Sequence, residues 1–311
     1  MNVVYIFFNR PDKVARSFQA VRHARPRQLY LVCDGPRQGR DDDRDHVARC
    51  QEIVRSLIDW DCHVTEDYSD VNLGCGRRVG SGISNALDVL GEAVILEDDC
   101  IPHETFFPFC QTMLDRYRDD SRVMSITGNN FQQGVTRGSG SYYFSKYPHI
   151  WGWATWRRAW NHFDPQIQFW PEFRDSRMLR AVCSTEAEVR YWTAIFDAFH
   201  AGKIDTWDYP WLLCFWSQNG LAVTPNVNLV SNVGFGPDAT HTSEATAQSC
   251  MPTSPIGGDL QPLGVLADVE ADEFVTETVF GIRQQSNAGF RKRVRGLLRR
   301  VKHRMRGRRV G

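Results

Sequence analysis

Three consecutive carboxylates follow a short apolar segment in the first third of the sequence. Glu97, Asp98 and Asp99 come directly after the apolar residues 93–96. Carboxylates this close repel one another unless a cation or a network of hydrogen-bond donors compensates their charge. Oxygen ligands of this kind suit magnesium or manganese, and such an ion can neutralise charge on diphosphate oxygens. The triplet therefore predicts a divalent-metal site, with an acidic cap on the following helix as the structural alternative.

Two earlier segments, residues 3–8 and 29–33, are apolar enough to be buried strands, and each ends in polar or turn-forming residues. Side chains that follow the strands of a parallel α/β sheet meet at one edge, where the ligands of such sheets bind. We therefore expect these strand ends to lie beside the acidic triplet. The candidate ligand-binding residues there are Asn9, Arg10, Asp34 and Gly35.

The spacing of apolar residues predicts helices between these strands. Val14, Phe18 and Val21, for example, recur at helical intervals after the first strand. Alternating strands and helices are typical of an α/β fold with a mostly parallel central sheet flanked by helices. The expected elements in this part of the chain are strands at 3–8, 29–33, 62–66 and 93–96 and helices at 12–23, 41–60 and 79–90.

The regular alternation ends in the middle of the chain. An aromatic-rich stretch runs from residue 142 to residue 170. Residues 238–262 are rich in Thr, Ser, Gly and Pro, which predicts a long loop that could act as a lid beside a site. The other expected elements are helices at 103–117, 186–201 and 207–216 and strands at 123–127 and 221–225.

The composition indicates an ordinary globular protein. Its 311 residues are 42% hydrophobic and 24% charged, which is enough to bury a large core. The apolar runs are far shorter than the roughly 20 residues that span a bilayer, and no signal-peptide pattern opens the chain, so we expect a cytoplasmic protein. The nine cysteines are an odd number without CxxC spacing, which favours free thiols over disulfides or zinc.

The net charge of zero conceals a basic C-terminal tail. Residues 291–311 hold eleven Lys and Arg and no acid, which leaves 26 minus 37, or −11, for the first 290 residues. Apolar residues recur at helical spacing among these arginines, a pattern suited to lying on an anionic membrane surface. We expect a membrane partner at the inner face rather than a nucleic acid, with a disordered solubilising tail as the other alternative.

Two motifs occur in the order and at the spacing of a known enzyme family. The first is Leu96–Pro102 followed by Phe106-Phe107, and the second is Trp207–Trp211 followed by residues 223–236. Both resemble segments of the N-acetylglucosaminyltransferase I family, which belongs to the GT-A nucleotide-sugar transferases. The resemblance implies a GT-A fold, in which an acidic motif at the end of a central strand binds the sugar donor through a metal.

Three further segments, Asn72–Cys75, Ile95–Asp99 and Trp151–Trp156, resemble bacterial HlpA-like sugar transferases. The resemblance covers roughly residues 1–245. It implies a GT-A domain at 1–245, with a donor half at about 1–128 and an acceptor half at about 129–245, followed by a variable segment at 246–290 and the basic amphipathic tail at 291–311.

The same resemblance assigns roles within the predicted donor site. Asp99 would ligate the metal, manganese or magnesium, while Glu97 and Asp98 would place the nucleotide ribose and the sugar. Asp34 would contact the base or the ribose. His241 would supply a late metal ligand or a phosphate contact, with an ordinary loop histidine as the alternative. By analogy the donor is UDP-linked, and UDP-N-acetylglucosamine is the first candidate.

Arg77 and Arg78 follow Gly74-Cys75-Gly76 where a helix is expected to begin. Guanidinium groups and the amino end of a helix both favour phosphate. We therefore expect these arginines to meet the diphosphate of the donor, with an exposed helix start as the structural alternative.

Asp208 lies between two aromatic residues in the second motif. A carboxylate within hydrogen-bond reach can take the proton of an acceptor hydroxyl, so Asp208 is the expected catalytic base of an inverting transfer. A helix cap is the structural alternative. The sequence departs from the resembled family by having Tyr209-Pro210 where a second acid would stand, and Asp205 is the reserve candidate for the base.

Three tryptophans are expected on the acceptor side of the site, two of them because the resemblance implies it and the one next to Asp208 because aromatic faces stack well on sugar rings. Burial in the core is the alternative for each of them. They are Trp151, Trp153 and Trp207.

Together these features predict a glycosyltransferase of the hexosyltransferase class. It would move a sugar from a nucleotide-diphosphate sugar to a glycan, lipid-linked or protein acceptor in bacterial surface-glycan biosynthesis. One alternative is a nucleotidyltransferase of similar fold, although the first strand is not followed by a glycine-rich, lysine-bearing phosphate loop. The other is a non-catalytic, haemolysin-like surface protein, although no segment resembles a pore-forming or secreted sequence.

Overall fold

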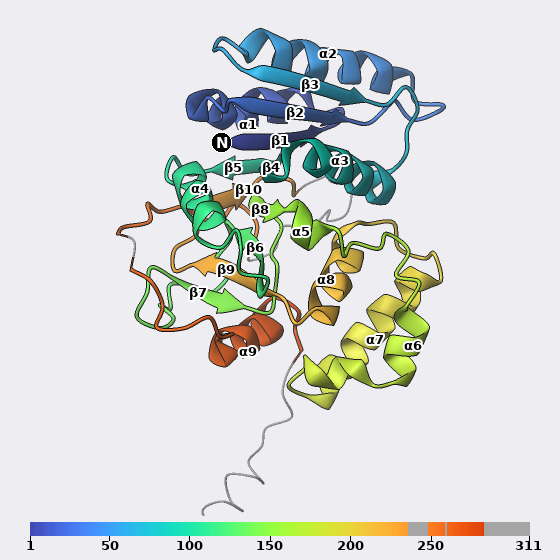
Figure 1. Cartoon of the computed structure of the whole chain (residues 1–311). Coiled ribbons are helices and arrows are strands. Elements are labelled where there is room, and N and C mark those ends of the chain that lie inside the picture. Colours follow the sequence, from blue (N-terminus) through green and yellow to red (C-terminus); the bar gives the residue numbers. More distant parts are fainter. Residues whose placement is uncertain (236–247, 259, 283–311) are drawn as a thin grey trace, which may run out of the picture.

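A mixed eight-stranded sheet forms the centre of the molecule in the computed structural model, which describes residues 1–235, 248–258 and 260–282 (Figure 1). The strand order is β3-β2-β1-β4-β8-β6-β9-β7. Six strands run in one direction, and β7 and β8 run against them. The expected α/β fold with a mostly parallel sheet is therefore confirmed. The strands are β1 (Asn2–Phe7), β2 (Gln28–Cys33), β3 (His63–Tyr68), β4 (Glu92–Glu97), β6 (Val123–Thr127), β7 (Tyr142–Ser145), β8 (Trp153–Trp156) and β9 (Leu221–Pro225).

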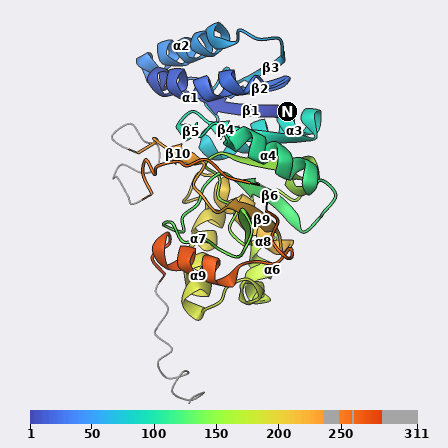
Figure 2. The ribbon, with the colours of Figure 1, turned by 90° about the vertical axis from the view of Figure 1, so that its left-hand side faces the viewer.

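Helices cover both faces of the sheet, as Figures 1 and 2 show from two sides. Successive side chains of a strand point to opposite faces. Accordingly, Tyr5 of β1 belongs to the apolar cluster that includes residues of α1, α2 and α4, whereas Ile6 belongs to the cluster that includes residues of α3, α5, α7 and α8. The helices are α1 (Pro11–Ala24), α2 (Asp41–Leu57), α3 (Cys75–Leu90), α4 (Phe106–Arg116), α5 (Arg157–Trp160), α6 (Trp170–Asp175), α7 (Glu186–His200), α8 (Asp208–Ser217) and α9 (Val269–Thr278).

The aromatic-rich stretch contains two strands, β7 and β8, that were not predicted from the sequence. Every residue of both strands is buried. Neither strand therefore shows the alternation of apolar and polar residues that identifies a half-buried strand. β8 lies between β4 and β6, so this unpredicted strand joins the first half of the sheet to the second.

A second sheet of two short strands adjoins the end of β4. β5 (Cys100–Pro102) directly follows the acidic triplet and pairs antiparallel with β10 (Val230–Asn232). This pairing brings a segment from late in the chain against the residues that follow β4.

Several predictions fall outside the described residues. His241, the basic tail at 291–311 and much of the expected loop at 238–262 belong to this group. All nine cysteines lie within the described residues and are free thiols, as expected. In the described part of the chain, no helix combines the length and the apolar character needed to cross a bilayer.

Helix α9 lies in the segment at 246–290 and forms part of the core. Ala271 and Val275 are buried, and so is the carboxylate of Asp272, which is 3% exposed. This carboxylate accepts hydrogen bonds from the Ser145 hydroxyl at 2.6 Å and the Lys146 backbone N–H at 3.2 Å. The bonds fasten α9 to the end of β7.

Asp272→Asn is expected to stabilise the protein at pH 7 more than at pH 4. Burial raises the pKa of Asp272 from 3.8 to about 6, so the folded state loses stability relative to the unfolded state as the pH rises through this interval. The loss amounts to about 3 kcal/mol above pH 6. Urea unfolding at both pH values measures the effect, with Glu277→Gln on the exposed side of α9 as the control. A difference between wild type and Asp272→Asn that does not change with pH would contradict this account.

Candidate active site

The carboxyl ends of the strands that share one direction bring four chain segments to one edge of the sheet. Arg10 lies just beyond β1, Asp34 beyond β2, Asp98 beyond β4 and Asn129 beyond β6. β1 lies between β2 and β4 and pairs in parallel with both. The first three residues are therefore near neighbours, as in other α/β sheets that bind ligands at strand ends.

Arg10 is the counterion of the acidic triplet. Its guanidinium forms an ion pair with Asp98, and its Nη2 lies 3.2 Å from Asp99 Oδ2. Asp98 also accepts the Phe8 backbone N–H at 3.4 Å, and its side chain is only 2% exposed. Asp98 thus fastens β4 to the turn after β1, and its expected contact with the donor stays a prediction. Glu97 and Asp99, both half-buried, are the members that a ligand can reach.

One arginine does not compensate three adjacent carboxylates. Burial, followed by repulsion from Asp99 and Asp98, raises the pKa of Glu97 to about 8. Burial also raises the pKa of Asp98, although the pairing with Arg10 opposes this rise. Asp208 adds further negative charge near Glu97. Such an excess of negative charge is relieved when a cation binds.

The chemistry of these groups fits a hard divalent cation. Among the residues that the structure describes, no three His, Cys, Asp or Glu side chains are arranged to enclose a metal ion. Magnesium is commonly held by one or two carboxylates, with phosphate oxygens and water in the other positions, and manganese accepts the same oxygen ligands. With Asp99 as the accessible carboxylate, the site therefore fits a metal that is shared with a phosphate-bearing ligand.

The segment after β10 packs closely against Asp99. The Val233 N–H donates to the Asp99 carbonyl oxygen at 2.8 Å, and Asn232 Nδ2 lies 3.4 Å from Asp99 Oδ1. A side chain at Gly234 would clash with the Asp99 carboxylate, so this close approach requires glycine. The next residue, Phe235, lines the cavity described below.

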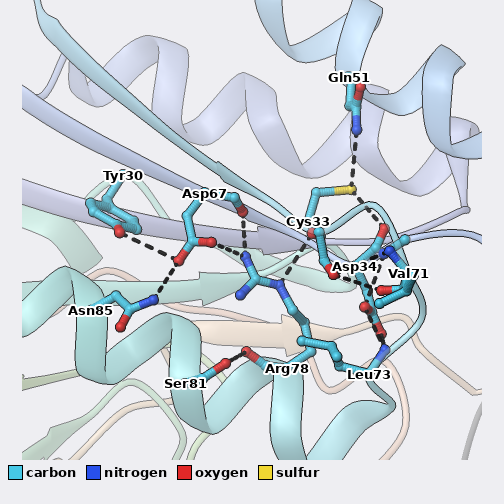
Figure 3. Close-up of polar contacts among 12 residues, drawn as sticks. Tyr30, Cys33, Asp34, Gln51, Asp67, Val71, Leu73, Arg78, Ser81 and Asn85 are labelled. Atoms are coloured by element: carbon cyan, nitrogen blue, oxygen red, sulfur yellow. Dashed lines mark hydrogen bonds and ion pairs between the residues drawn. The ribbon is translucent and has the colours of Figure 1, made fainter.

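Asp34 anchors a loop rather than facing a ligand (Figure 3). Its Oδ1 accepts the N–H groups of Gly35 and Leu73 at 2.9 Å each. Its Oδ2 accepts the Gly74 N–H and the Asn72 side-chain amide at 3.0 Å each. Both oxygens are thus used within the protein, and the residue is 8% exposed. Asp34 therefore has a structural role, and its expected contact with a base or ribose stays a prediction.

Gly35 and Asn9 also have structural partners instead of the ligand contacts expected of them. A Cβ on Gly35 would lie 2.6 Å from the backbone of Val71, so its lack of a side chain allows the turn and the loop to meet. Asn9 Nδ2 donates to Asp43 Oδ1 at 2.7 Å, and Arg37 donates to the same oxygen at 2.8 Å. Asp43, which was not predicted from the sequence, is 1% exposed and ties these turns to α2.

Arg78 connects β2 with β3 (Figure 3). Its Nε donates to the Cys33 carbonyl oxygen at 3.2 Å, and its Nη2 pairs with Asp67 Oδ1 at 2.7 Å. The residue is only 4% exposed, and these acceptors are all protein groups. Arg78 therefore holds β2 and β3 together, and its expected phosphate contact stays a prediction. Arg77 lies exposed on the same turn of α3.

A protein carboxylate already occupies the amino end of α3. Asp205 Oδ1 accepts the Gly76 N–H at 3.2 Å, and a Cβ on Gly76 would lie 2.5 Å from the same oxygen. Unpaired N–H groups at a helix start attract anions, and here Asp205 supplies the negative charge. The contact ties α3 to the loop before α8 and replaces the expected phosphate at this helix end.

A cavity of about 370 Å³ lies near the acidic triplet, because its lining includes Asp208, whose charge acts on Glu97, and Phe235, which follows Gly234. This volume is at the low end of the range of roughly 300–1,000 Å³ for small-molecule pockets. The wall is formed by residues that follow β6 and β7, by α7 and α8, and by the segment after α9. Its aromatic side chains include those of Phe131, Tyr147, Trp151, Trp192, Tyr209 and Phe235.

Asp208 belongs to the cavity wall and lies near enough to Glu97 for their charges to interact. Its charge raises the pKa of both Glu97 and Cys75, after burial and the nearer charges. Its Oδ1 accepts the Tyr209 N–H at 2.9 Å and the Thr206 hydroxyl. Asp208 is the first residue of α8, but no side chain caps this helix. Asp208 is thus not the N-cap residue, but its carboxylate does hold an N–H group of the first turn of α8.

Only Trp151 lines the cavity among the three tryptophans expected to contact an acceptor. Its ring meets Phe235 edge-on with the centroids 5.6 Å apart. Trp153 and Trp207 are 0% and 2% exposed and stack on each other at 5.5 Å. These two tryptophans belong to the core, because each indole ring covers the face of the other on which a sugar ring would stack.

Two cavity residues, Asn129 and Trp192, were not predicted from the sequence. Asn129 follows β6, so the rule applied to the ends of the earlier strands would have found it. Trp192 lies on the apolar side of α7. Helical periodicity does not distinguish a residue in a cavity wall from one in the core, so no sequence signal identifies Trp192.

No model of a known protein family matches the sequence, and no curated protein matches it. Among solved structures, the galactosyltransferase LgtC in complex with donor and acceptor sugar analogues is 13% identical over 94% of this chain and 99% of its own, with a TM-score of 0.38. The 4-diphosphocytidyl-2C-methyl-D-erythritol synthase from Anaerococcus prevotii is 10% identical over 71% of this chain and 86% of its own, with a TM-score of 0.35.

The mannosyltransferase PcManGT from Pyrobaculum calidifontis, in complex with GDP-Man and Mn²⁺, is 17% identical with a TM-score of 0.34. The match covers 50% of this chain and 44% of that protein, so the chain spans less than half of its length. Similarities of this size do not define a family. The functional argument therefore rests on the residues of the site.

Proposed function

We propose that this protein is a glycosyltransferase of the GT-A type, which transfers a sugar from a nucleotide-diphosphate sugar to a hydroxyl acceptor with the help of a divalent metal. The observation that carries the proposal is the group of three carboxylates at the end of β4, for which Arg10 is the counterion. This excess charge lies at the edge of the sheet where α/β proteins bind nucleotides. An aromatic cavity suited to a second substrate lies near it.

The donor side of the site is assigned to Glu97, Asp99 and Arg10. A divalent cation bound by Asp99 would neutralise the charge that develops on the departing nucleoside diphosphate. Asp98, paired with Arg10, holds the end of β4 in place. Glu97 is the other half-buried member of the triplet, and we propose that it accepts hydrogen bonds from the hydroxyl groups of the ribose or the sugar.

The transfer step is assigned to Asp208. The acceptor oxygen forms a bond to the anomeric carbon of the donor sugar, and the bond from that carbon to the diphosphate oxygen breaks. The bonding electrons leave with the nucleoside diphosphate, and Asp208 takes the proton of the acceptor hydroxyl. The position of Asp208 in the cavity wall and near Glu97 supports this assignment. Displacement from the opposite face would invert the anomeric centre.

The donor and pathway rest on the sequence resemblance. A UDP-linked sugar is proposed, with UDP-N-acetylglucosamine as the first compound to test. The proposed pathway is bacterial surface-glycan biosynthesis. Trp151 is the tryptophan proposed to contact the acceptor, since it lines the cavity whereas Trp153 and Trp207 are buried in the core.

A thermal-shift screen of nucleotide sugars, with and without manganese, tests the proposal. We expect at least one nucleotide-diphosphate sugar to raise Tm in the presence of manganese and to have a much smaller effect in its absence, because the metal links Asp99 to the diphosphate. Nucleoside triphosphates serve as the comparison set. A protein stabilised only by a triphosphate would be assigned to nucleotidyl transfer instead.

A further inference from the structure

The Asp99 carboxylate receives hydrogen bonds from three separate parts of the chain. Asn232 Nδ2 lies 3.4 Å and Cys100 Sγ 3.6 Å from Oδ1, and Arg10 Nη2 lies 3.2 Å from Oδ2. The Asp99 side chain is still 16% exposed. A carboxylate has about four lone-pair sites on its two oxygens. The donors of the described chain use three of these sites, and the site that they leave is on Oδ2.

The side chain of Asn232 is itself held in one orientation. It is 7% exposed, and its Oδ1 accepts the Gly234 N–H at 2.7 Å. Because this oxygen already accepts a hydrogen bond, the amide nitrogen is the atom that faces Asp99. The backbone of Asn232 pairs with Cys100 in the two-stranded sheet, and its carbonyl oxygen accepts the Cys250 N–H at 2.9 Å. These contacts fix the amide donor beside the carboxylate.

Gly234 leaves the room that the Asp99 carboxylate occupies. A Cβ at this position would lie 2.3 Å from Asp99 Oδ2 and 2.9 Å from Asn232 Oδ1. The φ of Gly234 is not positive, so an L-residue could adopt its backbone conformation, and the contact alone excludes a side chain. Any larger residue at this position would have to displace the carboxylate.

We infer that Asn232 is a positioning residue of the cation site and that Gly234 makes room for the orientation that Asn232 imposes on Asp99. A hydrogen bond to a ligating carboxylate fixes the direction of its free lone pair, and loss of such a partner typically lowers metal affinity 10–100-fold. Asn232 would act in this way from 133 residues further along the chain, without touching the cation. The inference rests on the role of Asp99 as the metal ligand, which is part of the proposed function.

Binding of manganese alone tests the inference without turnover. Electron paramagnetic resonance measures the free ion as the protein is titrated, and circular dichroism verifies that each variant is folded. Asn232→Ala is expected to raise the Kd for manganese about tenfold, because Asp99 is no longer held in one orientation. An unchanged Kd in the folded variant would overturn the inference.

Asn228→Ala is the matched control for Asn232→Ala. Asn228 lies just before β10, and its side chain also holds this part of the chain. Its Oδ1 accepts the Asn130 N–H at 3.1 Å, and its Nδ2 donates to the Val230 carbonyl oxygen at 2.9 Å. These contacts do not involve Asp99, so Asn228→Ala should lower Tm but leave the Kd for manganese unchanged. Equal increases of Kd in the two variants would contradict the positioning role.

Gly234→Ala provides a second test in case Asn232→Ala does not fold. The new methyl group would meet the end of the Asp99 side chain, so the carboxylate should turn away and the Kd for manganese should rise about tenfold or more. Gly257→Ala is the control, because no described atom lies within 4 Å of a Cβ there. A wild-type Kd in Gly234→Ala, or the same rise in Gly257→Ala, would contradict the inference.

The wild type separates this inference from the proposed function. A wild-type protein that binds no manganese, either alone or with UDP, refutes the metal site of the proposed function, and the positioning role is refuted with it. A wild-type protein that binds manganese no more tightly than folded Asn232→Ala and Gly234→Ala refutes the positioning role alone.

Discussion

Asp99→Ala is expected to abolish metal-dependent turnover of the nucleotide sugar while leaving the fold intact. The Asp99 side chain is partly exposed and lies beside Glu97 and Asp98. Its removal takes away the proposed protein ligand of the metal. A metal that stabilises the leaving group contributes several kcal/mol, and ~4 kcal/mol corresponds to a loss of about 10³-fold in rate. Release of nucleoside diphosphate at varied manganese concentration measures the effect.

The stability of the same variant separates a metal role from a structural one. Removing one of three adjacent carboxylates relieves repulsion on Glu97 and Asp98, so the Tm of Asp99→Ala should equal or exceed that of wild type. The control is Asp61→Ala, which removes an exposed carboxylate that is distant from the triplet in the sequence. This variant should keep full activity. Full manganese-dependent turnover in Asp99→Ala would exclude Asp99 as the metal ligand.

Asp208→Asn is expected to lose transfer but to keep donor binding. The amide has the shape of the carboxylate and can still accept the Tyr209 N–H, so the start of α8 should be preserved. It cannot take the proton of the acceptor hydroxyl, and the loss of a general base lowers kcat by about 10²–10⁴-fold. Steady-state kinetics with a saturating donor, combined with a separate measurement of donor affinity, distinguishes the two effects.

Asp205→Asn is the matched control for the catalytic base. Asp205 lies three residues before Asp208 and was the other candidate from the sequence, but its Oδ1 accepts the Gly76 N–H at the start of α3. The amide oxygen of asparagine can keep this bond, so turnover should be close to that of wild type. If Asp205→Asn loses transfer and Asp208→Asn retains it, the base role belongs to Asp205.

Much of the sheet could be predicted because apolar patterns and strand ends are local features. Residues 123–127 and 221–225 form strands with the expected bounds. By contrast, β7 and β8 are buried throughout and contain aromatic residues at non-alternating positions. A pattern of this kind is compatible with more than one element type, and only the packing of the whole sheet decides it.

The sequence was enough to predict which charged residues gather at the candidate site, but not which protein groups these residues bind. The acidic triplet and Arg10 meet as expected, because adjacent parallel strands place their ends together. Asp34 and Arg78 have the residue types of ligand-binding groups, yet both are used to hold loops and strands. Which acceptor a buried charge finds depends on contacts between residues far apart in the sequence, and no local pattern encodes them.

The residues that line the cavity could likewise be predicted only in part from the sequence. Trp151 lines it while Trp153, two residues later, is fully buried. Two residues so spaced would share a face of an extended strand, but Gly152 between them has a φ of 69°, which breaks the alternation. Trp192 and Phe280 reach the cavity from segments far from the motif. Their contribution follows from the packing of α7 and of the residues after α9.

The manganese dependence of nucleotide-sugar binding tests the central claim most directly. A ligand at 100 times its Kd stabilises the folded state by ~2.7 kcal/mol, and each kcal/mol corresponds to roughly 2–4 °C for a protein of this size class. We therefore expect one nucleotide-diphosphate sugar to raise the Tm of the wild type by about 5–10 °C with manganese, and the rise to disappear without the metal and in Asp99→Ala. The absence of such a rise with any nucleotide-diphosphate sugar, or an equal rise in Asp99→Ala, would contradict the account.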